Sequence, residues 1–238
     1  MNTTAGAVIC GAGIAGVAAA YHLTRRGITS IVLVDEGPPL SLTSDKSAES
    51  YRNWWPGPGS DMVSLMNRSI DLMEGLARES GNVFLMNRRG YLFATAQPEQ
   101  VERYLRAAEE AALLGLGPVR VHRSPGDDYR PAPAAGYEGQ PTGTDVITDR
   151  SVIRRHFPYL AEDTIALLHA RRCGWFSGQQ LGMYMLERAR ARGARLIEGR
   201  VERVETTGGR VSGVKVAGPG GSRTVGTPRF VNAAGPHV

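Results

Sequence analysis

Cysteine is scarce in this chain, with two residues, Cys10 and Cys173, among 238 and no CxxC pair. Such a low count excludes a disulfide framework and a zinc ribbon, and it predicts a reducing, cytoplasmic setting. The N-terminus has neither a basic segment nor a long apolar core, so we expect no secretory signal peptide. No uncharged apolar run approaches the ~18 residues of a membrane span, so we expect no transmembrane helix.

Dense basic patches and metal-binding patterns are missing as well. The net charge of +5 comes from scattered lysines and arginines, so we expect no nucleic-acid partner. The five histidines form neither HxH nor HExxH, so no metal site is predicted. No G-x-S-x-G nucleophile elbow is present. With 42% hydrophobic residues, the chain has enough apolar surface for one large domain or two small ones.

A glycine-rich motif stands near the start, in "VICGAGIAGVAAAYHLTRRG" (residues 8–27). Gly11, Gly13 and Gly16 have G-x-G-x-x-G spacing. The apolar run before them predicts a buried strand, and residues 14–26 predict a helix that ends near Gly27. A second apolar run, "SIVLVD", ends in Asp35. Strand, glycines, helix, strand and acid in this order predict a dinucleotide-binding site.

Each part of the motif has a physical role. Gly11 permits the tight turn, Gly13 lets a pyrophosphate approach the backbone, and Gly16 lets the helix pack close to the strand. The N–H groups at the helix N-terminus face the phosphates. Asp35, which lies 19 residues after Gly16, is placed to accept hydrogen bonds from ribose hydroxyls. An acid at this position argues against the 2′-phosphate of NADP.

The remaining chain distinguishes FAD from NAD. Helices are predicted over residues 61–80, 98–114 and 178–192, and a strand over residues 89–95. Residues 122–145 are rich in proline and glycine, and we expect them to form an exposed, mobile surface loop. Residues 199–227 contain three strands separated by glycine pairs, which predict an antiparallel meander. A plain NAD-binding domain would continue to alternate strands and helices, so the meander favours FAD.

Several stretches together resemble one family. They are the glycine motif, "VLVDEGPP", "NVFLMNRRGYLFAT", "RRHFPYL", "CGWFSGQQLGMYMLERARARGARLIEGRVERVE" and "FVNAAG". The chain resembles the N-terminal portion of the FAD-dependent amine and amino-acid oxidoreductase superfamily, whose members are similar to D-amino-acid oxidase, glycine oxidase and sarcosine oxidase. The resemblance implies an α/β fold. It comprises a Rossmann-like FAD-binding domain with an antiparallel β-meander, plus part of a second α+β substrate domain.

The resemblance also implies site residues and an activity. The expected FAD-binding residues are Gly11, Ala12, Gly13, Ile14, Ala15, Gly16, Asp35, Glu36, Ser47, Arg52, Val201, Ala233, Ala234 and Gly235. Among these, Arg52 matches a flavin-proximal arginine, for which an ordinary surface salt bridge is the alternative. The expected enzyme is an FAD-dependent oxidoreductase that oxidises a small amine or amino acid at a C–N bond, with hydride transfer to the flavin. No residue of this chain is assigned a catalytic role.

The expected domains are residues 1–82 with 174–238 for FAD, and 83–173 for part of the substrate domain, with the insertion at 122–145. Relatives of this type are longer, so we expect a missing C-terminal half or a partner chain. Two alternatives stay open. One is a non-catalytic FAD-binding fragment or subunit that needs a partner chain, and the other is an NAD-dependent Rossmann enzyme.

Overall fold

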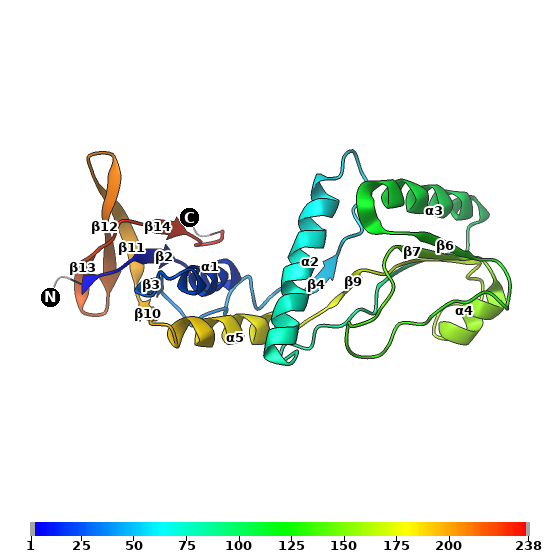
Figure 1. Ribbon diagram of the computed structural model, residues 1–238, viewed down its shortest axis with the longest axis horizontal. Coiled ribbons are helices and arrows are strands. Elements are labelled where there is room, and N and C mark those ends of the chain that lie inside the picture. Colours follow the sequence, from blue (N-terminus) through cyan, green and yellow to red (C-terminus); the bar gives the residue numbers. More distant parts are fainter. Residues whose placement is uncertain (1–2, 237–238) are drawn as a thin grey trace. The chain divides into compact units, whose positions relative to one another are not determined.

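The computed structural model describes residues 3–236 and divides the chain into two compact units (Figure 1). The first unit runs to Ala48 and resumes at Gly178, and the second is Glu49–Ser177. These boundaries differ from the predicted domain boundaries, because the helix over residues 61–80 lies in the second unit. Among the described residues, no helix is long and apolar enough to cross a membrane.

A parallel sheet forms the centre of the first unit. Its strands are β10 (Arg195–Glu198), β3 (Ile31–Asp35), β2 (Ala7–Cys10) and β14 (Phe230–Asn232), in that spatial order. All three strand pairs are parallel. Strands β2 and β3 are almost completely buried, as expected for continuous apolar runs in a parallel sheet that is covered on both faces.

Helices and a meander cover the parallel sheet. Helix α1 (Ile14–Arg25) packs against α5 (Gly178–Arg190). Side chains of alternating sheet residues, among them Val8, Val32 and Val34, form a core with Val214, Val216 and Val225 of the meander. This alternation follows from the two-residue period of strands, so the sheet has helices on one face and the meander on the other.

The meander agrees with the prediction. Strands β11 (Arg200–Thr207), β12 (Arg210–Gly218) and β13 (Gly221–Gly226) pair antiparallel, and β1 (Thr3–Thr4) pairs parallel with β13. Gly208 and Gly209 form the two-residue turn between β11 and β12 with φ values of 57° and 75°. Positive φ at both central residues is what a type I′ hairpin turn requires.

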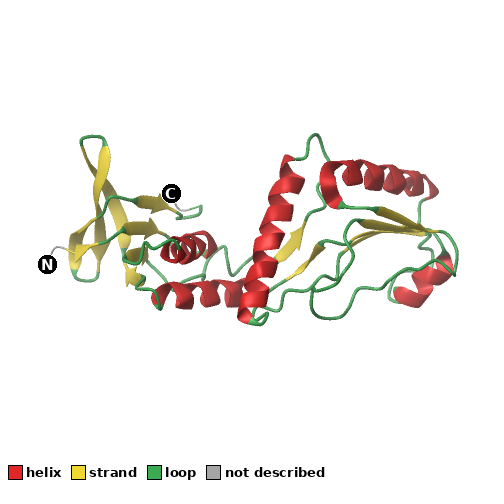
Figure 2. Cartoon of the chain, in the orientation of Figure 1, coloured by secondary structure: helices red, strands yellow, loops and turns green. Residues whose placement is uncertain are grey.

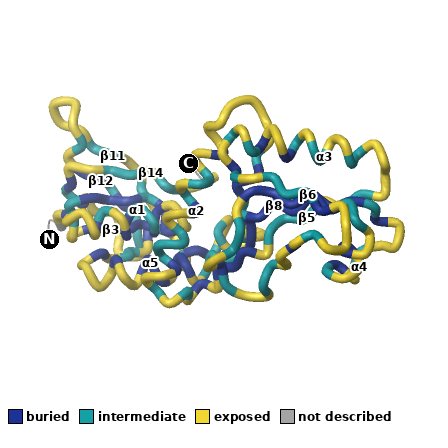
Figure 3. Tube along the Cα trace, turned by 45° about the vertical axis from the view of Figure 1, so that its right-hand side comes forward, coloured by how far each residue is buried: buried dark blue, intermediate teal, exposed yellow. Residues whose placement is uncertain are grey.

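The second unit is built on a mixed four-stranded sheet. Its order is β5 (Tyr91–Thr95), β8 (Ala166–Ala170), β7 (Thr144–Ile147) and β6 (Val119–His122), and only the β6–β7 pair is parallel. A small antiparallel pair joins β4 (Ser50–Arg52) to β9 (Cys173–Trp175). All residues of β7 and β8 are buried, and Figure 3 shows dark blue chain at the β8 label.

The helices of the second unit begin and end where local sequence signals predict. Helix α2 (Asp61–Ser80) ends at Gly81, which adopts a left-handed φ of 67°. Helix α3 (Pro98–Ala111) begins with proline, continues into the π-helical turn η1 (Ala112–Leu116) and is kinked at Gly115. Helix α4 (Arg150–His156) starts after Asp149, whose carboxylate accepts from the Val152 N–H. Figure 2 shows these helices and the strands between them.

The prediction of an exposed loop over residues 122–145 holds for most of the segment but not for its ends or its tyrosines. Residues 123–143 form no helix or strand, and more than half of them are exposed. The two ends of the predicted loop belong to β6 and β7, which pair with each other. Tyr129 and Tyr137 within it are 7% and 6% exposed, and His122 and Asp145 at its ends are buried. The proline and glycine content predicts the irregular backbone of this segment. It does not predict that the two tyrosines, and the charged or polar side chains at the ends, are buried. We call residues 123–143 the strap.

Candidate cofactor site

The glycine turn joins β2 to α1, and two of its glycines are enclosed by backbone. Gly11 has a φ of 98°, and a Cβ there would lie 2.3 Å from the carbonyl oxygen of Ala233. A Cβ at Gly16 would lie 2.0 Å from the carbonyl oxygen of Gly11. Neither contact can be relieved by a side-chain rotation, because both partners are main chain. Gly11 and Gly16 are therefore required for the fold of the turn itself.

Gly13 differs from its two neighbours in the motif. Its φ of −70° and ψ of −179° are available to any residue. Within the described part of the chain, a Cβ at Gly13 would meet only the Ser44 Oγ within 4 Å, at 3.4 Å, an ordinary contact. The protein fold therefore does not require glycine at position 13. A glycine there leaves the space in front of the turn open.

The N-terminus of α1 faces that space. Gly13 is the N-cap residue, no side chain caps the helix from that position, and the first turn contains no acidic residue. The hydroxyl oxygen of Ser44 accepts a hydrogen bond from the Ile14 N–H at 2.9 Å. The N–H groups of Ala15 and Gly16 have no intrahelical acceptor, as in any first turn. This end of α1 is suited to an anion, because its donors and its dipole are both directed outward.

Asp35 connects the glycine turn to the end of β3. One carboxylate oxygen accepts from the Ala12 N–H at 2.7 Å, and the other accepts from the Gly37 N–H at 3.0 Å. A carboxylate has about four acceptor positions, so two remain for hydroxyl groups of a ligand. Asp35 thus stabilises the turn and keeps the capacity to bind ribose.

The small-residue turn after β14 lies against the glycine turn. The Ala233 N–H donates to the Cys10 carbonyl at 2.8 Å, and the Ala234 N–H donates to the Asn232 side chain at 3.2 Å. Gly235 has a φ of 65°. The structure therefore brings Ala233 and Ala234 to Gly11, although more than two hundred residues separate them.

Val201 and Glu36 lie near the end of β3. The Gly199 N–H donates to the Asp35 carbonyl at 2.8 Å, so the chain enters β11 beside that acid. Val201 packs at the margin of the meander core, next to a β-bulge in β11. The Glu36 carboxylate is exposed and lies 4.0 Å from Arg200. Both residues flank the place where Asp35 ends the strand.

The loop after β3 closes on the glycine turn, which the sequence did not predict. The Leu40 N–H donates to the Ala12 carbonyl at 3.0 Å. The Leu40 side chain fills the space beside Gly182 of α5, where a Cβ would lie 2.4 Å from a Leu40 methyl carbon. The Gln179 amide donates to the Leu40 carbonyl at 2.9 Å. Since Ser44 belongs to this loop, its contact with Ile14 is set by packing between residues 30 apart, for which no local signal exists.

Ser47 and Arg52 are the expected site residues that lie farther along the chain, at the end of the first unit and in the second unit. Ser47 is exposed at the end of the first unit. Arg52 belongs to β4 in the second unit, and its guanidinium carbon lies 4.4 Å from the Trp55 ring centre and 5.7 Å from that of Tyr91. Stacking on two aromatic rings gives Arg52 a defined position.

Two further groups bear on the chemistry of the site. Burial, together with the charges of Asp35 and Glu36, raises the pKa of the Cys10 thiol, which keeps it a neutral packing residue beneath the turn. Across residues 3–236, no three His, Cys, Asp or Glu side chains are grouped as a metal site would need.

The sequence matches the family described as FAD dependent oxidoreductase over residues 7–238. The chain belongs to this family. Membership confirms the predictions of family, fold class and FAD as the cofactor, and it places the chain among enzymes. The glycine turn, Asp35 and the meander are thus parts of an FAD-binding protein.

Known relatives share either sequence or fold with the chain. Mitochondrial dimethylglycine dehydrogenase from Rattus norvegicus is 31% identical over 97 residues, which are 41% of this chain and 11% of that protein. Glycine oxidase from Bacillus cereus superposes with a TM-score of 0.75 at 19% identity, over 98% of this chain and 56% of that one. L-Proline dehydrogenase from P. horikoshii gives 0.73 at 21% identity, over 98% and 53%. These low identities show a shared fold, and the chain spans about half the length of both solved structures.

Proposed function

We propose that this chain provides the FAD-binding part of an enzyme that oxidises a small amine or amino acid at a C–N bond. The observation that carries the proposal is the open space at Gly13 in front of the α1 N-terminus. The relatives support the substrate class, since their names refer to glycine, proline, amino acids and dimethylglycine.

The residues around the glycine turn fit a dinucleotide. The N–H groups of Ala15 and Gly16 would donate to the pyrophosphate, which Gly13 admits because it lacks a side chain. Asp35 would accept from the adenosine ribose with the two acceptor positions that the turn leaves open. The remaining lining would come from Ala12, Ile14, Glu36, Val201, Ala233, Ala234 and Gly235.

The two outlying residues are proposed to lie on the flavin side. Bound FAD supplies the acceptor for a hydride equivalent from the substrate carbon. Arg52, held by Trp55 and Tyr91, would contribute a positive charge that favours the reduced cofactor, and Ser47 would contribute a hydroxyl near it. Pyrophosphate and ribose contacts would then provide most of the affinity, whereas Arg52 would tune the chemistry.

The alternatives predict different measurements. An NAD-dependent enzyme would form NADH without flavin, and a non-catalytic subunit would bind FAD but leave it oxidised. The FAD-dependent family match disfavours the first alternative.

The test is anaerobic bleaching of the full-length, FAD-loaded protein by a panel of secondary amines and α-amino acids, followed at the visible flavin band. The proposal expects bleaching by at least one amine and none by matched alcohols. Bleaching by alcohols alone would contradict the proposed substrate class. In the Arg52→Gln variant we expect slower bleaching with unchanged FAD content, while Arg68→Gln, an exposed position on α2, serves as control.

A further inference from the structure

The strap is held to the second unit mainly through its own carbonyl groups. Arginine side chains donate to four of them: Arg171 to Arg130 at 2.9 Å, Arg89 to Ala134 at 2.8 Å, Arg88 to Gln140 at 3.0 Å and Arg120 to Thr142 at 2.9 Å. The Arg88 N–H also donates to the Gly136 carbonyl at 3.0 Å. A segment with few apolar residues is thus fixed by charged donors from outside it.

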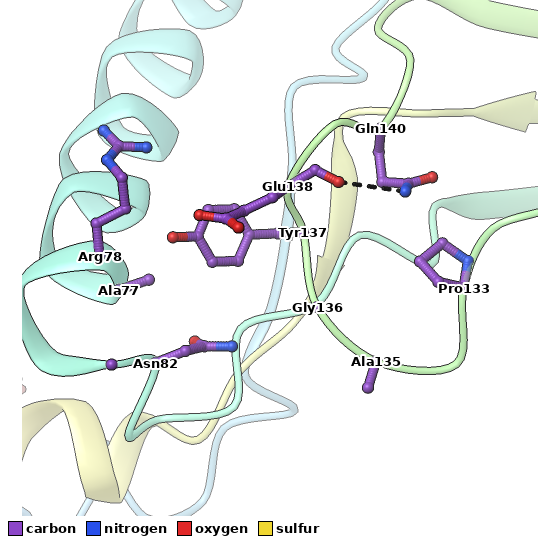
Figure 4. A pocket seen from close by; sticks show the side chains of 10 residues that line it. Ala77, Arg78, Asn82, Pro133, Ala135, Gly136, Tyr137, Glu138 and Gln140 are labelled. Atoms are coloured by element: carbon purple, nitrogen blue, oxygen red, sulfur yellow. Dashed lines mark hydrogen bonds between the residues drawn. The ribbon is translucent and has the colours of Figure 1, made fainter.

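The strap forms one wall of a cavity of about 510 Å³. Figure 4 shows residues from Pro133 to Gln140 on this wall and Ala77 and Arg78 of α2 opposite them. The Tyr137 hydroxyl donates to the Glu74 carbonyl of α2 at 3.3 Å. The pocket is already partly open to solvent, and displacement of the strap would remove one of its walls.

His169 of β8 lies where two strap anchors meet. Its Nδ1 atom is 2.9 Å from the Tyr129 hydroxyl and 2.9 Å from Nη1 of Arg171. Its Nε2 atom is 2.9 Å from the Arg89 carbonyl, which can only accept, so Nε2 carries the proton and Nδ1 accepts. The ring fits because position 90 is glycine, where a Cβ would lie 2.0 Å from Nε2. The arrangement requires a neutral imidazole.

Charged or titratable groups lie around His169 on β6, β7 and α4 and at the end of β8, whereas β5, which pairs with His169 through Leu92, carries no Asp, Glu, Lys, Arg or His. Arg171 follows β8, Asp145 lies opposite on β7, and Arg120 and His122 belong to β6. From α4, His156 faces the same Tyr129 ring. Asp145 is the one carboxylate among these five groups and already binds Arg120 and His122. A proton on His169 would therefore be placed against a guanidinium with little compensation.

We propose that His169 makes the strap a pH-sensitive closure, in which protonation of its Nδ1 atom expels the Arg171 guanidinium and loosens the strap from the sheet. Protonation removes the acceptor that Arg171 uses, whereas the Tyr129 hydroxyl can rotate and accept from the new N–H. Protonation also sets an imidazolium 2.9 Å from the Arg171 guanidinium, and Arg171 is the donor that holds the Arg130 carbonyl.

The direction of the effect follows from the pKa of His169. Burial first, and then the positive charge of Arg171, lower that pKa from 6.5 to about 4. Once the strap opens, solvent returns the pKa toward 6.5, so the open form binds the proton more tightly. The closure is fully stable above pH 6.5 and weakens as the pH falls toward 4. Asp145 stays ionised over this window: although burial raises its pKa, hydrogen bonds from Arg120 and His122 hold it below 3.8.

Hydrogen exchange of the full-length, FAD-loaded protein tests the closure between pH 7.5 and 4.5. The peptides to follow cover residues 85–90, which include the Arg88 amide bonded to the strap, and residues 123–143. After correction for intrinsic exchange, the equilibrium constant for opening of the strap should rise by up to about tenfold for each pH unit below pH 6. An opening constant that does not change with pH in the wild-type protein would overturn the proposal.

Histidine variants identify the titrating group. We expect His169→Gln to abolish the pH dependence, while His156→Gln and His122→Gln retain it. Loss of the dependence in either control, or its persistence in His169→Gln, would contradict the assignment. If His169→Gln does not fold, ring-proton titration of the wild-type histidines replaces it. One histidine should then titrate well below pH 6.5 in step with strap opening, and the absence of such a histidine would overturn the proposal.

Discussion

The glycine turn and the strap are both rich in glycine, but glycine has a different role in each. In the turn, Gly11 and Gly16 lie against main-chain atoms that a Cβ would overlap. In the strap, Gly126, Gly136 and Gly139 have nothing within 4 Å of the position of a Cβ. The turn depends on its backbone fitting closely against other backbone, whereas the strap depends on side chains from elsewhere that bind its carbonyl groups.

The difference implies opposite sensitivities to mutation. In the glycine turn, main-chain atoms pack directly against other main-chain atoms. One added methyl group cannot be accommodated there, because neither main-chain segment can rotate away as a side chain would. The strap has room for a Cβ at Gly126, Gly136 and Gly139, although the positive φ of the last two strains any side chain there. It depends on arginine side chains outside it, which are those of Arg88, Arg89, Arg120 and Arg171. Gly143, at the end of the strap, is an exception, since a Cβ there would lie 2.0 Å from the Pro118 carbonyl.

The largest effect is expected for Gly16→Ala. The added methyl group would lie 2.0 Å from the Gly11 carbonyl, so α1 must move away from β2, at a cost of more than about 4 kcal/mol in the free energy of unfolding. Urea unfolding of the full-length apoprotein measures this cost. The control is Gly27→Ala, which has open space and should cost only about 1 kcal/mol for its left-handed backbone. Equal losses in the two variants would contradict the account of the turn.

A smaller but substantial loss is expected when the anchor of the strap is broken. Asp145→Ala leaves Arg120 and the buried Arg171 without their carboxylate partner, and removing one member of a buried pair costs about 3 kcal/mol. Thermal unfolding would measure the loss, with Glu102→Ala as control, because the Glu102–Arg106 pair is exposed. If Asp145→Ala unfolded at the same temperature as the wild-type protein, the strap would not be held through the ion pairs of Asp145.

The smallest effect, and of opposite sign, is expected within the strap. Gly126→Ala meets no atom within 4 Å and restricts the unfolded chain, which should stabilise the protein by about 0.5 kcal/mol. Gly143→Ala, at the crowded end, should destabilise it instead. Chemical unfolding of both variants sharpens the comparison, and destabilisation by Gly126→Ala would place that glycine among the constrained ones.

Local signals predicted the parts of the fold whose causes are local. The glycine spacing, the proline that begins α3 and Gly81 after α2 each act on their own backbone, so helix bounds and the turn follow from short stretches. The anchoring of the strap was not predicted because its contacts are distant in sequence, such as Arg89 to Ala134 and Tyr129 to His169, 45 and 40 residues apart. The Ser44 contact at the site was missed for the same reason.

We propose that Gly13 is glycine because the cofactor needs the space in front of it, whereas Gly11 and Gly16 are glycine because the fold leaves no room for a Cβ. The decisive measurement is the Kd of FAD for Gly13→Ala full-length apoprotein, beside its urea unfolding curve. The account predicts an unchanged unfolding midpoint, since the methyl group would meet only the Ser44 Oγ at 3.4 Å. It also predicts FAD binding weaker by about tenfold to a hundredfold, the equivalent of one lost charge-assisted hydrogen bond, while Gly27→Ala keeps the wild-type Kd. Wild-type FAD affinity in Gly13→Ala, with its fold intact, would contradict the claim.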